Sequence, residues 1–102
     1  MQTIDGGNTI RESVQNAHQL AKKTRDSVAF RWGSSTIIVT PESKVEIQFP
    51  KESSSRFAVS HSIKMAQRLQ QNVSFQFGGT MITVEPQFDQ SDFIKLVEQL
   101  DR

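Results

Sequence analysis

The sequence contains no cysteine, and this absence excludes disulfide bonds, thiolate nucleophiles and cysteine-ligated zinc sites. Tyrosine, which often stacks on bases in nucleic-acid-binding sheets, is also absent, and there is one tryptophan. No apolar run approaches the roughly 20 residues that a membrane span needs. The first residues, MQTIDGGN, have neither the basic nor the apolar region of a signal peptide. We therefore expect a cytoplasmic protein, in the host cell if a phage encodes it.

A large excess of charge of one sign is lacking too. The chain has 12 basic and 11 acidic residues and a formal net charge of +1. A domain that binds nucleic acid strongly usually carries a larger basic excess. With 102 residues, of which 35% are hydrophobic, we expect a single domain over residues 1–102 with a modest core.

Two stretches of the chain resemble each other at a constant spacing of 45 residues. VAFRWGSSTIIVTP begins at Val28, VSFQFGGTMITVEP begins at Val73, and the two align without gaps. We interpret them as parts of an internal duplication, with convergence of two similar units as the alternative. The identical pairs are Arg11/Arg56, Val14/Val59, Ala21/Ala66, Val28/Val73, Phe30/Phe75, Gly33/Gly78, Ile37/Ile82, Val39/Val84 and Pro41/Pro86.

Each copy predicts a helix followed by a β-hairpin. Apolar residues recur at helical spacing first and then alternate, with glycine at the turn between the two strands. Repeat 1 spans about residues 9–41 and repeat 2 about residues 54–86. Strict alternation over residues 44–49 predicts a connecting strand, and residues 89–101 predict a C-terminal helix.

The predicted order is α-β-β-β-α-β-β-α, and the predicted fold class is α+β. We expect an antiparallel sheet of about five strands with helices on one face. A pseudo-twofold axis would relate the two helix–hairpin units, with the hairpins meeting at the centre of the sheet. The inward face would carry the core aromatics Phe30, Trp32, Phe75 and Phe77.

No constellation of residues indicates catalysis, a metal or a cofactor. The two histidines, His18 and His61, are not equivalent in the repeat and lie outside any metal-ligand spacing. A strained nucleophile turn of the Gly-x-Ser-x-Gly kind is missing from the sequence. We therefore predict that the protein is not an enzyme and uses neither a metal nor a cofactor.

The sheet face away from the helices offers a candidate partner surface. Ile38 and Met81 are apolar residues on a face that is otherwise polar, which can mark an interaction site, although scattered exposed apolar residues are also normal. The predicted partner-binding residues are Ile38, Met81, Arg31, Gln48 and Gln76. The strand at 44–49 is an alternative docking element, as a sheet edge that pairs with another chain. Either element would serve a homodimer or a complex with a larger protein.

A basic cluster gives the nucleic-acid alternative. Lys22, Lys23 and Arg25 fall in the last turn of the first predicted helix, where a phosphate could bind them. Cations at that position also suit the negative end of the helix dipole.

The second copy, continued as FQFGGTMITVEPQFDQSDFIKLVEQL, resembles small uncharacterised accessory proteins of phages and other mobile elements. Those proteins have a helix, an F-x-F-x-G hairpin, a V-x-V-x-P segment and an Asp-started helix with spaced leucines. The resemblance covers roughly the last third of the chain and departs from the pattern at Ile82, which stands in place of the first valine. The matching residues are Phe75, Phe77, Gly79, Val84, Pro86, Asp89 and Leu96.

The resemblance implies a setting rather than an activity, and it carries over no functional residue. Such accessory proteins are often non-enzymatic binders that block or redirect a host protein, including anti-CRISPR and other anti-defence inhibitors. The leading hypothesis is therefore a non-catalytic protein-binding module, with an accessory inhibitor of a host protein or complex as its setting. The alternatives are a small nucleic-acid-binding protein and a structural or assembly subunit of a phage particle or secretion apparatus.

Overall fold

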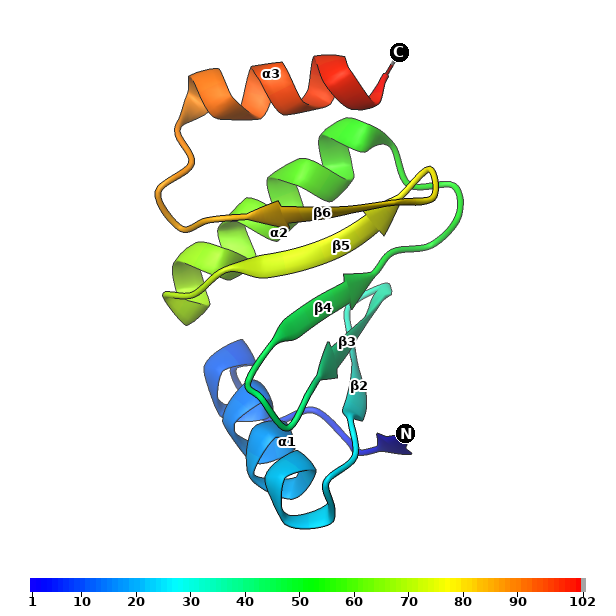
Figure 1. The fold of residues 1–102 in the computed structure, drawn as a ribbon, viewed down its shortest axis with the longest axis vertical. Coiled ribbons are helices and arrows are strands. Elements are labelled where there is room, and N and C mark those ends of the chain that lie inside the picture. The colour runs from blue at the N-terminus through cyan, green and yellow to red at the C-terminus, as the bar shows by residue number, and fades with distance from the viewer. Residues whose placement is uncertain (102) are drawn as a thin grey trace.

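The computed structural model describes residues 1–101, which form three helices and one six-stranded mixed sheet (Figure 1). The strands lie in the order β1-β2-β3-β4-β5-β6; β1/β2 and β4/β5 are parallel neighbours and the other pairs are antiparallel. The predicted α+β class is confirmed. The predicted antiparallel sheet of about five strands is wrong, because the sheet is mixed and has six strands. The elements are β1 (Gln2–Thr3), α1 (Ile10–Thr24), β2 (Val28–Trp32), β3 (Ser35–Val39), β4 (Val45–Gln48), α2 (Ser55–Leu69), β5 (Val73–Phe77), β6 (Thr80–Val84) and α3 (Gln90–Leu100).

The chain contains a β-α-β-β unit twice: β1-α1-β2-β3, and then β4-α2-β5-β6. In each unit the helix joins two parallel neighbouring strands, which need a crossover connection of this kind. The strand predicted at 44–49 is β4, and it begins the second unit instead of separating two repeats. Its counterpart β1 lies outside the predicted elements, because two residues are too short to show an alternating pattern.

The two hairpins do not meet at the centre of the sheet, since β4 lies between β3 and β5. The pair orientations make β4 run in the same direction as β1, and β5 and β6 in the same directions as β2 and β3. A twofold axis would reverse either the strand direction or the strand order between the units. The expected pseudo-twofold relation is therefore replaced by two units repeated side by side.

The ends of the first two helices repeat the same local chemistry 45 residues apart. Thr9 and Ser54 each accept a hydrogen bond from the backbone N–H three residues later, which caps the helix N-terminus. Arg25 and Gln70 adopt the left-handed conformation, with φ of 60° and 56°, and donate their N–H groups to the carbonyl four residues earlier. The geometry of the unit is thus repeated, while its origin by duplication stays a prediction.

The hairpins also repeat in register, and both use two-residue turns that begin with a glycine at positive φ, Gly33 and Gly78. Equivalent pairing of the strands gives two continuous rows of apolar side chains across five strands. The first row consists only of valines: Val28, Val39, Val45, Val73 and Val84. The second row is Phe30, Ile37, Ile47, Phe75 and Ile82.

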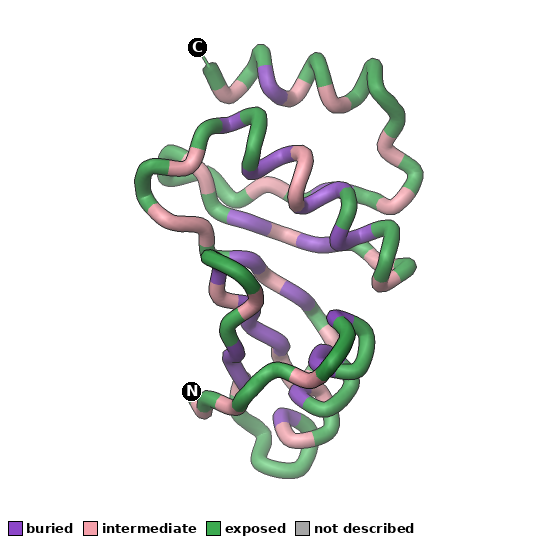
Figure 2. The backbone as a smooth tube through the Cα atoms, turned by 180° about the vertical axis from the view of Figure 1, so that it is seen from behind, coloured by how far each residue is buried: buried purple, intermediate pink, exposed green. Residues whose placement is uncertain are grey.

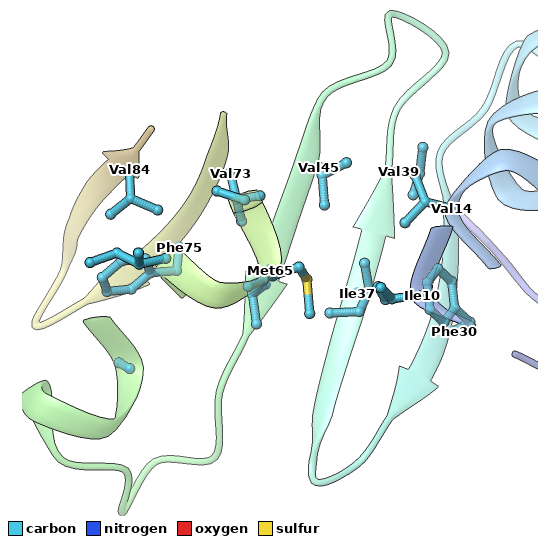
Figure 3. Packing of buried hydrophobic residues seen from close by; sticks show 14 of the residues in the cluster. Ile10, Val14, Phe30, Ile37, Val39, Val45, Met65, Val73, Phe75 and Val84 are labelled. Atoms are coloured by element: carbon cyan, nitrogen blue, oxygen red, sulfur yellow. The ribbon is translucent and has the colours of Figure 1, made fainter. Parts of the chain in front are cut away.

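These rows and the inward faces of α1 and α2 form one hydrophobic core, seen as the buried segments in Figure 2. Strand β4 supplies the central member of each row, and Met65 of α2 lies between the side chains of the two units (Figure 3). Of the four aromatics predicted as core, Phe30 and Phe75 are fully enclosed, with 2% and 0% exposure. Trp32 and Phe77 end their strands and are only half-buried.

Helix α3 is capped at its N-terminus by Asp89. The Asp89 side chain accepts the N–H of Asp92, and the Asp92 side chain in turn accepts the N–H of Asp89. The helix packs mainly against α2 through its buried Val97 and lies alongside β6 at one end of the molecule (Figure 1). Ile94 on the same helix is 46% exposed.

Ser62 of α2 is fully buried, and its hydroxyl has no hydrogen-bond partner in the part of the chain that the structure describes. The equivalent position in α1 is Ala17, which is also fully buried. An unpaired buried hydroxyl costs about 1–3 kcal/mol. We expect Ser62→Ala to raise the free energy of unfolding by about 1 kcal/mol in urea denaturation. The reciprocal Ala17→Ser should lower it, and a loss of stability in Ser62→Ala would contradict this explanation.

Candidate functional site

The sheet face away from the helices carries the residues predicted to bind a partner. Arg31, Gln48, Gln76 and Met81 are exposed and follow one line across the sheet, from β2 through β4 and β5 to β6. Ile38 belongs to the neighbouring line, where its cross-strand neighbours are Ala29 and Glu46.

Ile38 and Met81 do not form one apolar patch. Ile38 is 8% exposed because it lies on an inner strand between two neighbours, whereas Met81 on the outermost strand is 52% exposed. Two strands separate them, so they lie at least about 14 Å apart at roughly 4.8 Å per strand spacing, and they are also offset along the strands. The prediction that Ile38 offers an exposed surface is therefore wrong, and Met81 is left as the exposed apolar residue of this face.

The edge of β6 is a more specific feature. In the β5–β6 hairpin the backbone groups of Ile82 face Phe75, so those of Met81 and Thr83 point away from β5. Their two N–H and two C=O groups have no hydrogen-bond partner among residues 1–101. Edge strands are usually protected by a lysine, a proline, a bulge, or a covering helix or loop. The β6 sequence, TMITV, has no charge and no proline.

The repeat shows what such an edge can accept. Thr36 and Ile38 in β3 occupy the positions of Met81 and Thr83, and they pair with Gln48 and Glu46 of β4. The same edge is therefore covered by an antiparallel strand in the first unit and has no strand paired with it in the second. Strand β4, predicted as an alternative docking edge, is itself paired on both sides and cannot play that role.

The basic residues of the nucleic-acid alternative lie at the far end of α1. Lys22 and Lys23 are exposed in its last turn, and Arg25 is the left-handed C-cap residue. The negative end of the helix dipole is enough to favour cations at these positions. A phosphate-binding role for them stays a prediction.

A hollow of about 190 Å³ between α1 and α2 brings together residues that the sequence pattern left apart. It is built by three elements, so only the tertiary structure reveals it. Burial lowers the pKa of His61 below its usual value, and the nearby Lys64 and Arg68 lower it further. The lining residues are Ile10, Trp32, His61, Lys64, Met65 and Arg68.

Potential metal ligands do not gather in the part of the chain that the structure describes. Residues 1–101 contain no cluster of three or more His, Asp and Glu side chains that could hold a metal ion. His18 lies 3.3 Å from the Pro41 carbonyl oxygen, and His61 stacks on Phe57 with a centroid distance of 5.1 Å. The absence of enzyme activity stays a prediction.

Comparison with known proteins finds no matching family model, no matching curated protein and no matching solved structure. The resemblance to accessory proteins of mobile elements therefore remains a prediction from the sequence. None of the helices in residues 1–101 combines the length and apolar character needed to cross a membrane.

Proposed function

We propose that this chain is a non-catalytic protein-binding module that adds a strand of its partner to the edge of β6. The observation that carries the proposal is the unpaired backbone of Met81 and Thr83, at the edge that receives β4 in the first unit. Strand addition of this kind derives its affinity from main-chain hydrogen bonds and its selectivity from alternate side chains.

The pairing of β3 with β4 also indicates the chemistry of the partner strand. β4 turns Val45 and Ile47 toward the core and Glu46 and Gln48 toward the open face. A strand on β6 would likewise alternate, with its apolar side chains beside the half-buried Ile82 and polar ones beside Met81. An extended segment of a larger protein with an apolar–polar alternation fits this edge.

Such a binder would cover a surface of its partner, as expected of a mobile-element inhibitor of a host complex. A second copy of the chain is the other candidate occupant. A twofold axis at Ile82 would place Met81 of one copy opposite Thr83 of the other. The outward N–H and C=O groups of these residues would then form hydrogen bonds between the two copies. Larger regular oligomers in sedimentation would instead favour the assembly-subunit alternative.

Affinity capture from the native host, with two matched lysine variants, tests whether recognition uses the edge or the face. Met81→Lys places a charge on the edge strand, and Gln76→Lys places the same charge on the same face one strand inward. Since a cross-strand pair contributes about 0.2–1 kcal/mol, we expect Met81→Lys to weaken capture up to about fivefold and Gln76→Lys to leave it unchanged. Equal weakening by both variants would indicate recognition of the face and contradict strand addition.

A further inference from the structure

The hollow between α1 and α2 is bordered by basic side chains without acidic partners. Lys64 and Arg68 lie one turn apart on α2, and like charges at i and i+4 destabilise a helix slightly. His61 lies one turn before Lys64, and its lowered pKa favours the neutral ring. The only ion pair among residues 1–101 joins the Met1 amino group to Asp26, 3.0 Å away. Lys64 and Arg68 are both exposed, and neither has a carboxylate oxygen within 4.0 Å among residues 1–101. An anion in the hollow would relieve their mutual repulsion.

Two aromatic rings, Trp32 and His61, line the hollow together with these cations. Trp32 forms one wall and is held edge-on by Phe30, with ring centroids 6.5 Å apart and planes at 89°. On the α2 side, His61 stacks on Phe57, a residue that is 41% exposed. Sites for single-stranded nucleic acid combine cations along the backbone with aromatic faces on which bases stack. The hollow and the adjoining surface of α2 have this combination.

We propose that this site binds single-stranded nucleic acid, one nucleotide at a time in the hollow. A base would lie against Trp32 and His61, and the phosphates on either side of it would contact Lys64 and Arg68. A volume of about 190 Å³ suits one ring, since pockets for larger ligands usually span about 300–1,000 Å³. This function is separate from partner binding at β6, because the hollow lies between helices and not at the sheet edge.

The single tryptophan makes the test specific. The chain has one Trp and no Tyr, so its indole emission reports on the hollow alone. We expect an oligothymidylate to change Trp32 emission, with an affinity that falls as salt rises, by a log–log slope of about −1.4 for two phosphate contacts. Unchanged emission at saturating oligothymidylate would overturn the proposal.

Paired charge variants locate the binding site. Lys64→Ala with Arg68→Ala should weaken oligothymidylate binding about tenfold or more, because two charge-assisted contacts are lost. Lys22→Ala with Lys23→Ala removes the same charge from the far end of α1 and should leave the affinity unchanged. If replacing Lys22 and Lys23 weakened binding while replacing Lys64 and Arg68 did not, the site would lie at the end of α1. That result would overturn the proposal for the hollow. All four positions are exposed, so we expect circular dichroism to show that both double variants remain folded.

Three further ligands separate nucleic acid from other anions. Inorganic phosphate and polyglutamate should bind at least tenfold more weakly than oligothymidylate, because neither offers a base to stack. Thymidine monophosphate should also bind more weakly, because it carries one phosphate in place of two. Equal affinity for thymidine monophosphate would assign the hollow to a free nucleotide, and equal affinity for polyglutamate would assign it to an acidic peptide. Either result would overturn the proposal.

Discussion

Replacing Thr83 with proline is expected to abolish partner capture while leaving the fold intact. The Thr83 N–H points away from β5, so the proline ring removes a backbone hydrogen bond to the partner and no backbone hydrogen bond within the sheet. The substitution also removes the Thr83 hydroxyl that bonds the Ser74 hydroxyl of β5. Proline is tolerated on an edge strand when its position faces away from the neighbour, and the preceding Ile82 already has the extended conformation that proline requires. Affinity capture and circular dichroism of the variant measure the two halves of this expectation.

Thr83→Val is the matched control. Valine keeps the backbone N–H and the β-branched shape but removes the hydroxyl that lies 2.9 Å from that of Ser74. We expect it to capture the partner as the native chain does. Loss of capture in both variants would show that the side chain, and not the backbone edge, carries recognition. Undiminished capture by Thr83→Pro would rule out strand addition at this position.

Ile47→Ala is expected to lower the free energy of unfolding by about 2–5 kcal/mol, because it empties a fully buried site. Ile47 is the central member of the second apolar row, with Ile37 on one side and Phe75 on the other. A loss of this size is a large part of the 5–15 kcal/mol that stabilises a typical domain. Gln48→Ala, next along β4 but exposed, should change stability by less than about 0.5 kcal/mol.

The same variant tests whether the two β-α-β-β units unfold together. Trp32 emission reports on the first unit, and far-ultraviolet circular dichroism reports on both. Since β4 joins the units in both apolar rows, the two signals should follow one urea transition that shifts to lower concentration in Ile47→Ala. A Trp32 transition that stays in place while the dichroism shifts would show two independent units.

The local structure of this chain could be predicted because its signals lie close together in the sequence. Thr9 and Ser54 cap their helices through hydrogen bonds that span three residues, and Asp89 caps the last helix in the same way. The hairpins follow from alternation and from a glycine at each turn, features that lie within 12 residues of one another. Each of these features depends on its own segment alone.

The arrangement of the units could not be predicted in this way. The sheet order depends on the pairing of β4 with both hairpins, and β1 is only two residues long. The exposure of Ile38 follows from that order, because the same residue on an edge strand would be open to solvent, as Met81 is. The hollow likewise forms only because Trp32 of β2 and residues of α2 come close in the folded chain. Alternation within one strand does not reveal that contact.

Amide hydrogen exchange at Met81 and Thr83, in the free chain and in the captured complex, tests strand addition most directly. In the free chain both amides should exchange fast, because neither N–H has a hydrogen-bond partner. The equivalent amides of Thr36 and Ile38 should exchange slowly in both states, since β4 already covers them. We expect Met81 and Thr83 to become as slow as Thr36 and Ile38 in the complex. Equally fast exchange of Met81 and Thr83 in the free chain and in the complex would contradict binding at the edge of β6.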